Sequence, residues 1–231
     1  MPRHVFAFDA GIGVGHQPGN ARNFTGPGMN LEAAFGVTHD VQLGLRTGIR
    51  MGDDGRAIQA DRYARTLFTE TWGTNGDVIA NPEFGVRWRF VEGRVVEIGL
   101  DGRAYLPIEQ GSNFGLMFGV PFAFHLGDSA RIDLGVYLPV VFGDGTPYAI
   151  SVPAYFWFQT SNKLWLGPMV ALRHIDPGPG DGFTDLLLGF GLGYQVAHWV
   201  DLKTMILFPR INQDEGARTV GAGFGVQLRI E

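Results

Sequence analysis

Two neighbouring stretches of the chain decide its fold. Residues 29–37 read MNLEAAFGV, and residues 41–49 read VQLGLRTGI. In both stretches apolar residues alternate with glycine or polar residues, a period of two that is typical of a strand with two different faces. Only Thr38, His39 and Asp40 separate them. The pair therefore predicts an antiparallel hairpin with a tight turn.

The same alternation recurs along nearly the whole chain. It predicts twelve strands at residues 4–15, 29–38, 41–50, 82–91, 95–106, 114–126, 130–142, 150–159, 163–173, 185–196, 199–209 and 219–230. Short turns fall near 39–40, 92–94, 127–129, 160–162 and 197–198, and longer loops at 16–28, 52–81, 107–113, 143–149, 175–184 and 210–218. Tilted strands of about 9–11 residues cross a bilayer, and short turns on one side with long loops on the other are typical of transmembrane barrels.

We therefore predict an all-β protein with a single domain over residues 1–231. The domain is a 12-stranded antiparallel up-and-down transmembrane β-barrel with both termini on the short-turn (periplasmic) side. An internal repeat supports the hairpins, because Asp101, Tyr105, Leu106 and Pro107 reappear 32 residues later as Asp133, Tyr137, Leu138 and Pro139. Val120-Pro121 reappears at the same offset as Val152-Pro153, and we expect the matching prolines at the loop-side ends of their strands.

Composition excludes several classes of protein. Charged residues make up 18% of the chain, below the roughly 25% of a soluble domain. A net charge of -5 with no basic run argues against a nucleic-acid partner. The absence of cysteine excludes a disulfide framework and a cysteine metal site. The first residues show no signal peptide, so we expect either a cytoplasmic protein or a mature sequence with an added initiator methionine.

The two faces of the predicted strands differ in charge. A soluble barrel with apolar residues inward is the alternative, but its exterior should be rich in Lys and Glu, whereas lysine occurs only at 163 and 203. The other arrangement places nearly uncharged residues against lipid, where a charge costs about 2–4 kcal/mol at the midplane. Aromatic residues near the short turns would then form an interfacial girdle: Trp88, Phe90, Phe122, Phe124, Phe156, Phe158, Tyr194 and Trp199.

In this pattern the chain resembles porin-like bacterial outer-membrane β-barrel proteins. The resemblance is carried by Asn81–Phe90 (NPEFGVRWRF), by the glycine-containing turn after it, and by a strand that ends in Tyr105-Leu106-Pro107. It implies a bacterial outer-membrane location and passive transport, with the lipid bilayer as partner. The chain departs from the family at its end, where Arg229-Ile230-Glu231 replaces the usual terminal aromatic residue.

Charged residues at the inner positions are the candidate pore lining. They are nine basic and eight acidic residues: Asp9, Glu32, Arg46, Arg50, Glu83, Arg87, Arg89, Glu97, Asp101, Arg103, Arg131, Asp133, Arg173, Asp185, Asp201, Lys203 and Arg229. One interpretation is a narrow pore that orders small polar or charged solutes by charge. The other is a structural or surface-binding barrel whose lumen is closed by ion pairs. Both interpretations include a basic wall with acidic residues interleaved. The basic residues are Arg46, Arg50, Arg87, Arg89 and Arg103, and the acidic residues are Glu83, Glu97 and Asp101.

The loop at 52–81 is a candidate constriction, because Tyr63, Leu67, Phe68 and Trp72 make it apolar; a plain hairpin above the membrane is the alternative. We predict no enzyme, no cofactor and no metal site. An outer-membrane hydrolase would need a Ser–His pair, and His125 and Ser151 fall at opposite ends of their strands. An acid pair with a histidine, such as Asp53-Asp54 with His174 and Asp176, has no supporting spacing.

Overall fold

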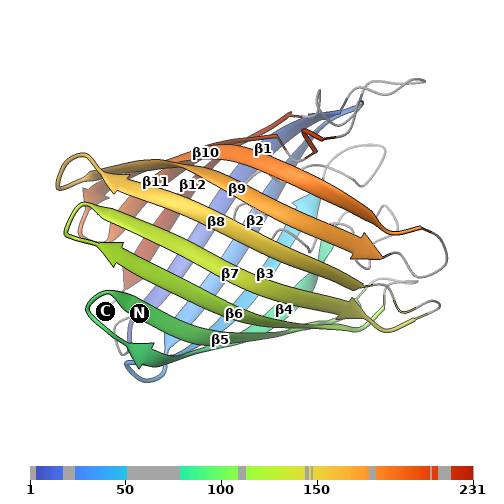
Figure 1. Ribbon diagram of the computed structural model, residues 1–231, viewed down its shortest axis with the longest axis horizontal. Coiled ribbons are helices and arrows are strands. Elements are labelled where there is room, and N and C mark those ends of the chain that lie inside the picture. The colour runs from blue at the N-terminus through green and yellow to red at the C-terminus, as the bar shows by residue number, and fades with distance from the viewer. Residues whose placement is uncertain are drawn as a thin grey trace.

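The computed structural model is a closed antiparallel barrel of twelve strands (Figure 1). It describes residues 4–17, 24–50, 79–108, 113–143, 146, 148–176, 181–208, 210–212 and 220–230, without the side chains of 17, 24–28, 49–50 and 79–81. The strands are β1 (Phe6–Gln17), β2 (Phe24–Gly36), β3 (Val41–Arg50), β4 (Ile79–Glu92), β5 (Val96–Tyr105), β6 (Gly115–Leu126), β7 (Ala130–Val141), β8 (Tyr148–Gln159), β9 (Leu164–Asp176), β10 (Phe183–Ala197), β11 (Val200–Phe208) and β12 (Val220–Ile230).

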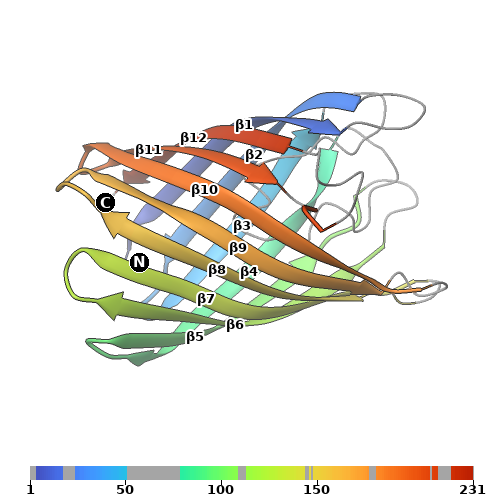
Figure 2. The same ribbon diagram turned by 45° about the horizontal axis from the view of Figure 1, so that its top comes forward.

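Each strand pairs with its neighbours in the sequence, and β1 also pairs with β12, which closes the barrel. Phe6 lies opposite Phe35, beside the first short turn, and opposite Ile230 near the end of the chain. Both ends of the described chain therefore lie at the short-turn end, as Figures 1 and 2 show. The predicted twelve-stranded antiparallel up-and-down barrel and the asymmetry between short turns and long loops are confirmed.

Several strands extend further toward the long loops than their composition indicates. Gly26, Pro27 and Gly28 read as loop residues, yet in β2 they pair with residues 13–15 of β1. Such residues are weak strand formers, so the partner strand decides their conformation. Two repeated prolines also differ from expectation, because Pro121 and Pro153 lie mid-strand in β6 and β8 rather than at the loop-side ends.

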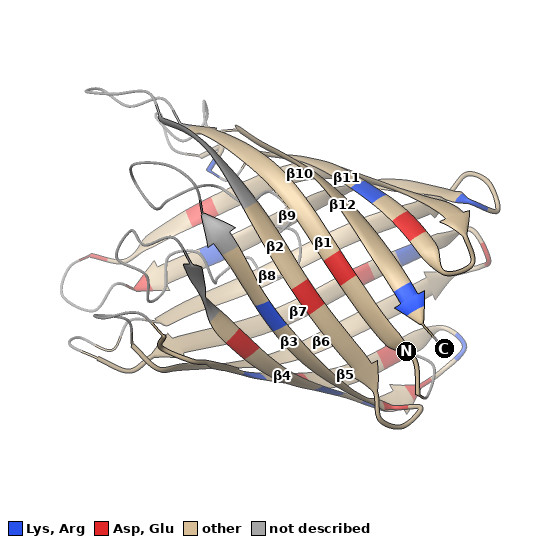
Figure 3. Ribbon diagram, turned by 180° about the vertical axis from the view of Figure 1, so that it is seen from behind, with Lys and Arg blue, Asp and Glu red and all other residues tan. Residues whose placement is uncertain are grey.

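The exterior of the barrel is apolar. Large hydrophobic side chains are exposed on every strand, among them Phe8, Leu45, Trp88, Leu100, Phe118, Val136, Phe158, Leu172, Phe190, Ile206 and Phe224. Arg50 has no described side chain, and Glu92 and Asp176 lie at strand ends. The other charged side chains of the strands line the internal cavity or are buried, and Figure 3 shows where these residues lie along the strands. Among the described residues, no helix is long and apolar enough to cross a membrane. The predicted assignment of the faces is therefore confirmed.

The apolar exterior allows a test of which side chains face lipid. We expect Val136→Arg, at an exposed position of β7, to lower the free energy of unfolding in lipid vesicles by about 2–4 kcal/mol, because a guanidinium in hydrocarbon loses its hydration. Denaturant titration followed by tryptophan fluorescence measures this change.

The matched control is Val95→Arg, the same change at an exposed valine in the turn between β4 and β5. We expect the free energy of unfolding to fall by less than about 0.5 kcal/mol in this variant, as for surface substitutions in general. Equal losses at Val136 and Val95 would contradict a lipid-facing exterior.

Candidate functional site

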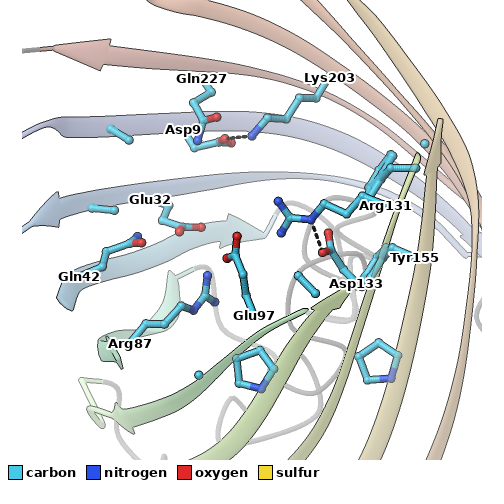
Figure 4. A pocket seen from close by; sticks show the side chains of 18 of the residues that line it. Asp9, Glu32, Gln42, Arg87, Glu97, Arg131, Asp133, Tyr155, Lys203 and Gln227 are labelled. Atoms are coloured by element: carbon cyan, nitrogen blue, oxygen red, sulfur yellow. Dashed lines mark hydrogen bonds and ion pairs between the residues drawn. The ribbon is translucent and has the colours of Figure 1, made fainter. Parts of the chain in front are cut away.

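A cavity of about 800 Å³ occupies the half of the lumen nearest the short turns. His39 and Asp40 line it at the mouth, and Tyr137 and Met169 line it near the middle of the barrel. Eleven of the predicted residues contribute to its lining: Asp9, Glu32, Arg46, Arg87, Arg89, Glu97, Arg103, Arg131, Asp133, Lys203 and Arg229. Figure 4 shows side chains of this set reaching into the cavity from several strands.

The centre of the predicted basic wall is a network of ion pairs between β4 and β5. Arg87 Nη2 donates to Asp101 Oδ2 at 2.8 Å, and Arg103 Nη2 donates to the same oxygen at 2.9 Å. Arg103 Nη1 also lies 3.5 Å from Glu83 Oε2. Asp101 and Glu83 are almost fully buried. One buried carboxylate therefore holds two guanidinium groups, an arrangement that compensates for the loss of hydration.

Further ion pairs follow the wall of the barrel. Lys203 Nζ donates to Asp9 Oδ2 at 2.6 Å across β12, and Arg229 pairs with Asp201. In β7, Arg131 Nε donates to Asp133 Oδ1 at 2.5 Å. These contacts confirm that the inner charges pair with one another.

Another buried pair lies toward the long loops. Arg173 Nη2 donates to Asp185 Oδ2 at 2.8 Å, and Arg210 Nε lies 3.5 Å from the same oxygen. Arg173, Asp185 and Asp201 are outside the cavity lining, and Arg210 is a partner that the strand pattern did not indicate because it follows β11.

The two members of these pairs differ in exposure. The side chain of Arg87 is 48% exposed and that of Asp101 3%; the values are 25% and 4% for Lys203 and Asp9, and 35% and 2% for Arg229 and Asp201. The carboxylates lie against the wall, and the longer basic side chains reach toward the lumen. In these three pairs the N–H donors are therefore the groups that a solute in the cavity can reach.

The mouth of the cavity is arranged differently. Arg89 lies 3.2 Å from both Asp40 Oδ1 and Glu92 Oε2 and 3.6 Å from Glu97 Oε2, and the carboxylates are the more exposed members. The hydrogen bond from Arg89 lowers the pKa of Asp40. His39, Asp40 and Glu92 bring possible metal-ligand atoms within 4.8 Å of one another. Arg89 also contacts all three, so this exposed cluster is an ion network around a guanidinium.

The inner face of β5–β11 is largely apolar toward the long loops. Its buried cluster consists of Tyr105, Met117, Val141, Ala149, Met169, Ala171, Ile175, Leu187 and Leu207. At the corresponding level, β1 carries Gly11, Gly13 and Gly15, and β12 carries Gly221 and Gly223. Side chains of β5–β11 therefore fill their side of the lumen in this half, whereas the described inner positions of β1 and β12 carry only glycine.

Aromatic rings lie flat over inner glycines. The Tyr137 ring spans Gly119 of β6 and Gly135 of β7, and Trp165 of β9 lies over Gly193 of β10. A Cβ at any of these glycines would overlap the ring. Sequence reasoning missed these rings as lining residues, although the same alternation places them inward. The glycines let the rings lie against the wall rather than across the lumen.

Other predicted residues do not form a site. Arg50 pairs through its backbone with Gly28, but its side chain is outside the description, as are residues 52–78 of the predicted constriction loop. His125 Nε2 contacts Glu97 Oε1 at 3.0 Å near the short turns. Ser151 is buried near the loop end of β8, and its Oγ has no hydrogen bond to a described residue. The structure does not bring Ser151 and His125 together.

Comparisons with solved structures identify the architecture. An outer-membrane channel from Pseudomonas putida F1 superposes with a TM-score of 0.68 over 100% of this chain and 97% of its own, at 9% identity. The chain has the fold of the outer-membrane porins. The NanC porin gives a TM-score of 0.65 (6% identity, 96% of this chain and 100% of the porin), and the KdgM porin gives 0.61 (11%, 96% and 99%).

The KdgM porin has also been solved in complex with disordered oligogalacturonate. No family model matches this sequence, and a search of curated proteins finds no match.

The charged network generates a prediction on stability. We expect Asp101→Asn to lower the free energy of unfolding by about 3–5 kcal/mol, because it leaves two guanidinium groups without their shared buried carboxylate. Asp133→Asn is the control, since Arg131 and Asp133 are both partly exposed, and exposed pairs contribute about 0–1 kcal/mol. Chemical unfolding in detergent micelles measures the free energy of unfolding of both variants. A similar small decrease in both would show that the Asp101 network is not buried.

The glycine contacts generate a second prediction. We expect Gly119→Ala to destabilise the barrel by about 1–3 kcal/mol, because the added methyl group displaces the Tyr137 ring. Gly44→Ala, also on the inner face, is the control, since the nearest atom to its Cβ is Ala33 O at 3.9 Å. Thermal unfolding monitored by circular dichroism compares them. An unchanged melting temperature in Gly119→Ala would contradict the packing of Tyr137.

Proposed function

We propose that residues 1–231 form a single domain in the bacterial outer membrane and act as a narrow pore for small polar or charged solutes, without catalysis. The observation that carries the proposal is the cavity of about 800 Å³, lined by half-exposed arginines, inside a barrel with an apolar exterior. The shared fold with outer-membrane channels supports it.

The two walls of the lumen suggest the route of a solute. Side chains such as Met117 and Leu207 are fully buried in the loop half of the β5–β11 wall. Glycine at three successive inner positions of β1, Gly11 to Gly15, leaves space on the other side. We infer that solutes leave the cavity along the β12–β1 wall, where the described inner residues of both strands are glycines. Such a one-sided passage is consistent with a barrel between filled eight-stranded and open sixteen-stranded barrels.

A closed barrel is the second candidate, and the buried apolar cluster together with the Arg173–Asp185 pair favours it. In a planar lipid bilayer the pore gives discrete conductance steps, whereas the closed barrel leaves the bilayer at its background current. The same recording decides between the two proposals.

The exposure of the arginines predicts ion selectivity. We expect the reversal potential in a salt gradient to shift toward cations in the double variant Arg87→Gln with Arg131→Gln, because these two guanidinium groups are each 48% exposed to the lumen. The fold should persist, since Asp101 keeps Arg103 as its partner.

Arg94→Gln is the control, because Arg94 is exposed in the turn between β4 and β5, outside the cavity lining. Its reversal potential should equal that of the wild type. A double variant with unchanged selectivity would remove these arginines from the solute path.

A further inference from the structure

We propose that the cavity selects organic anions that carry one flat apolar ring, with Arg131 binding the carboxylate and the Tyr155–Trp157 stack contacting the ring. This inference rests on the proposed function, because it names the class of solute that the same cavity takes. It is carried by the placement of half-exposed guanidinium groups beside stacked aromatic side chains in one cavity.

The two arginines offer donors to a solute. Arg131 uses Nε for Asp133, and Arg87 uses Nη2 for Asp101. Their other guanidinium nitrogens make no hydrogen bond to a residue that the structure describes, and both side chains point into the cavity (Figure 4). Each guanidinium is thus fixed by one carboxylate and retains N–H groups for a second. Guanidinium groups bind carboxylates with charge-assisted hydrogen bonds.

The acidic groups on the cavity are already engaged. Glu97 lies 3.0 Å from His125 and 3.6 Å from Arg89, and Asp9 accepts from Lys203. Glu32, which also lines the cavity, has an interaction partner as well. An incoming anion therefore meets carboxylates that already have partners, and Glu97 is the one that reaches into the cavity beside the arginines (Figure 4).

The aromatic surface lies next to Arg131. Arg131 is opposite Trp157, and Asp133 is opposite Tyr155, in the ladder between β7 and β8. The Tyr155 and Trp157 rings stack with centroids 6.1 Å apart and planes 2° apart. Side chains directly opposite one another in a ladder have Cβ atoms about 4.5–5.5 Å apart. A single ring that stacks on this pair can therefore place its carboxylate at Arg131.

The opposite wall favours an apolar ring over a sugar. In a closed barrel of twelve strands β10 lies opposite β4. On β10 the Trp157 ring lies over Gly191, and Met169 of β9 and Met205 of β11 flank this glycine in the cavity lining. An indole face and thioethers provide little for the hydroxyl groups of a sugar, each of which needs a hydrogen-bond partner when it is desolvated. Methionine sulfur instead makes favourable contacts with aromatic rings.

The experiment uses benzoate as the probe, with acetate (charge without ring), benzyl alcohol (ring without charge) and galacturonate (an acidic sugar) as comparisons. Isothermal titration calorimetry on the full chain in micelles measures binding without requiring conductance. We expect benzoate to bind at least about tenfold more tightly than each comparison compound. Benzoate should also block the ion current of the wild-type pore.

Three variants assign the two parts of the site. We expect Arg131→Gln to weaken benzoate and acetate binding alike, about tenfold. Trp157→Leu should weaken benzoate several-fold and leave acetate unchanged, and Arg94→Gln should change neither. Each variant is first checked for the β-sheet circular dichroism spectrum of the wild type. Trp157→Phe, which keeps a ring, should retain benzoate binding if Trp157→Leu does not fold.

The outcomes separate this inference from the proposed function. Benzoate binding in micelles without conductance would support the ring-and-carboxylate site and overturn the pore. Conductance with no preference for benzoate over acetate would support the pore and overturn the inference. Tighter binding of galacturonate than of benzoate would overturn it in favour of an acidic sugar.

Discussion

Every part of this structure depends on one constraint: a closed sheet with an apolar exterior must satisfy all its charges inside. Because the period of a strand is two, each charged residue of a strand either faces hydrocarbon or faces the other charges. The ion pairs of Asp101, Asp9 and Asp201 with their basic partners are the result. In these three pairs the short carboxylates lie at the wall and the longer basic side chains extend from it.

The sequence alone predicted the architecture well because one signal dominates it. Alternation over segments such as Met29–Val37 identifies both the strand and its two faces, and short turns such as His39-Asp40 determine which strands are neighbours. Boundaries were less predictable. Gly26 to Gly28 read as a loop from composition, and only the pairing of β2 with β1 makes them part of a strand.

The candidate site was predictable in membership but not in geometry. The inner positions of Arg87, Asp101 and Arg103 follow from alternation, but that one carboxylate holds two arginines depends on rotamers and register. The aromatic rings that line the lumen were missed for a different reason. Tyr137 and Trp165 look like ordinary strand residues, and their role as lining appears only when the glycines beneath them are placed on the adjacent strand.

The flat packing of rings over glycines has a consequence for how such a barrel changes over evolutionary time. A side chain gained at Gly193 is tolerated only if Trp165 becomes smaller, and a smaller residue at position 165 opens space that a side chain at 193 can fill. Substitutions at the two positions are therefore coupled, and each alone is deleterious. The width of the lumen should then change through paired substitutions on adjacent strands. Related barrels should therefore differ in lumen width at positions where an aromatic residue and its facing glycine are replaced together.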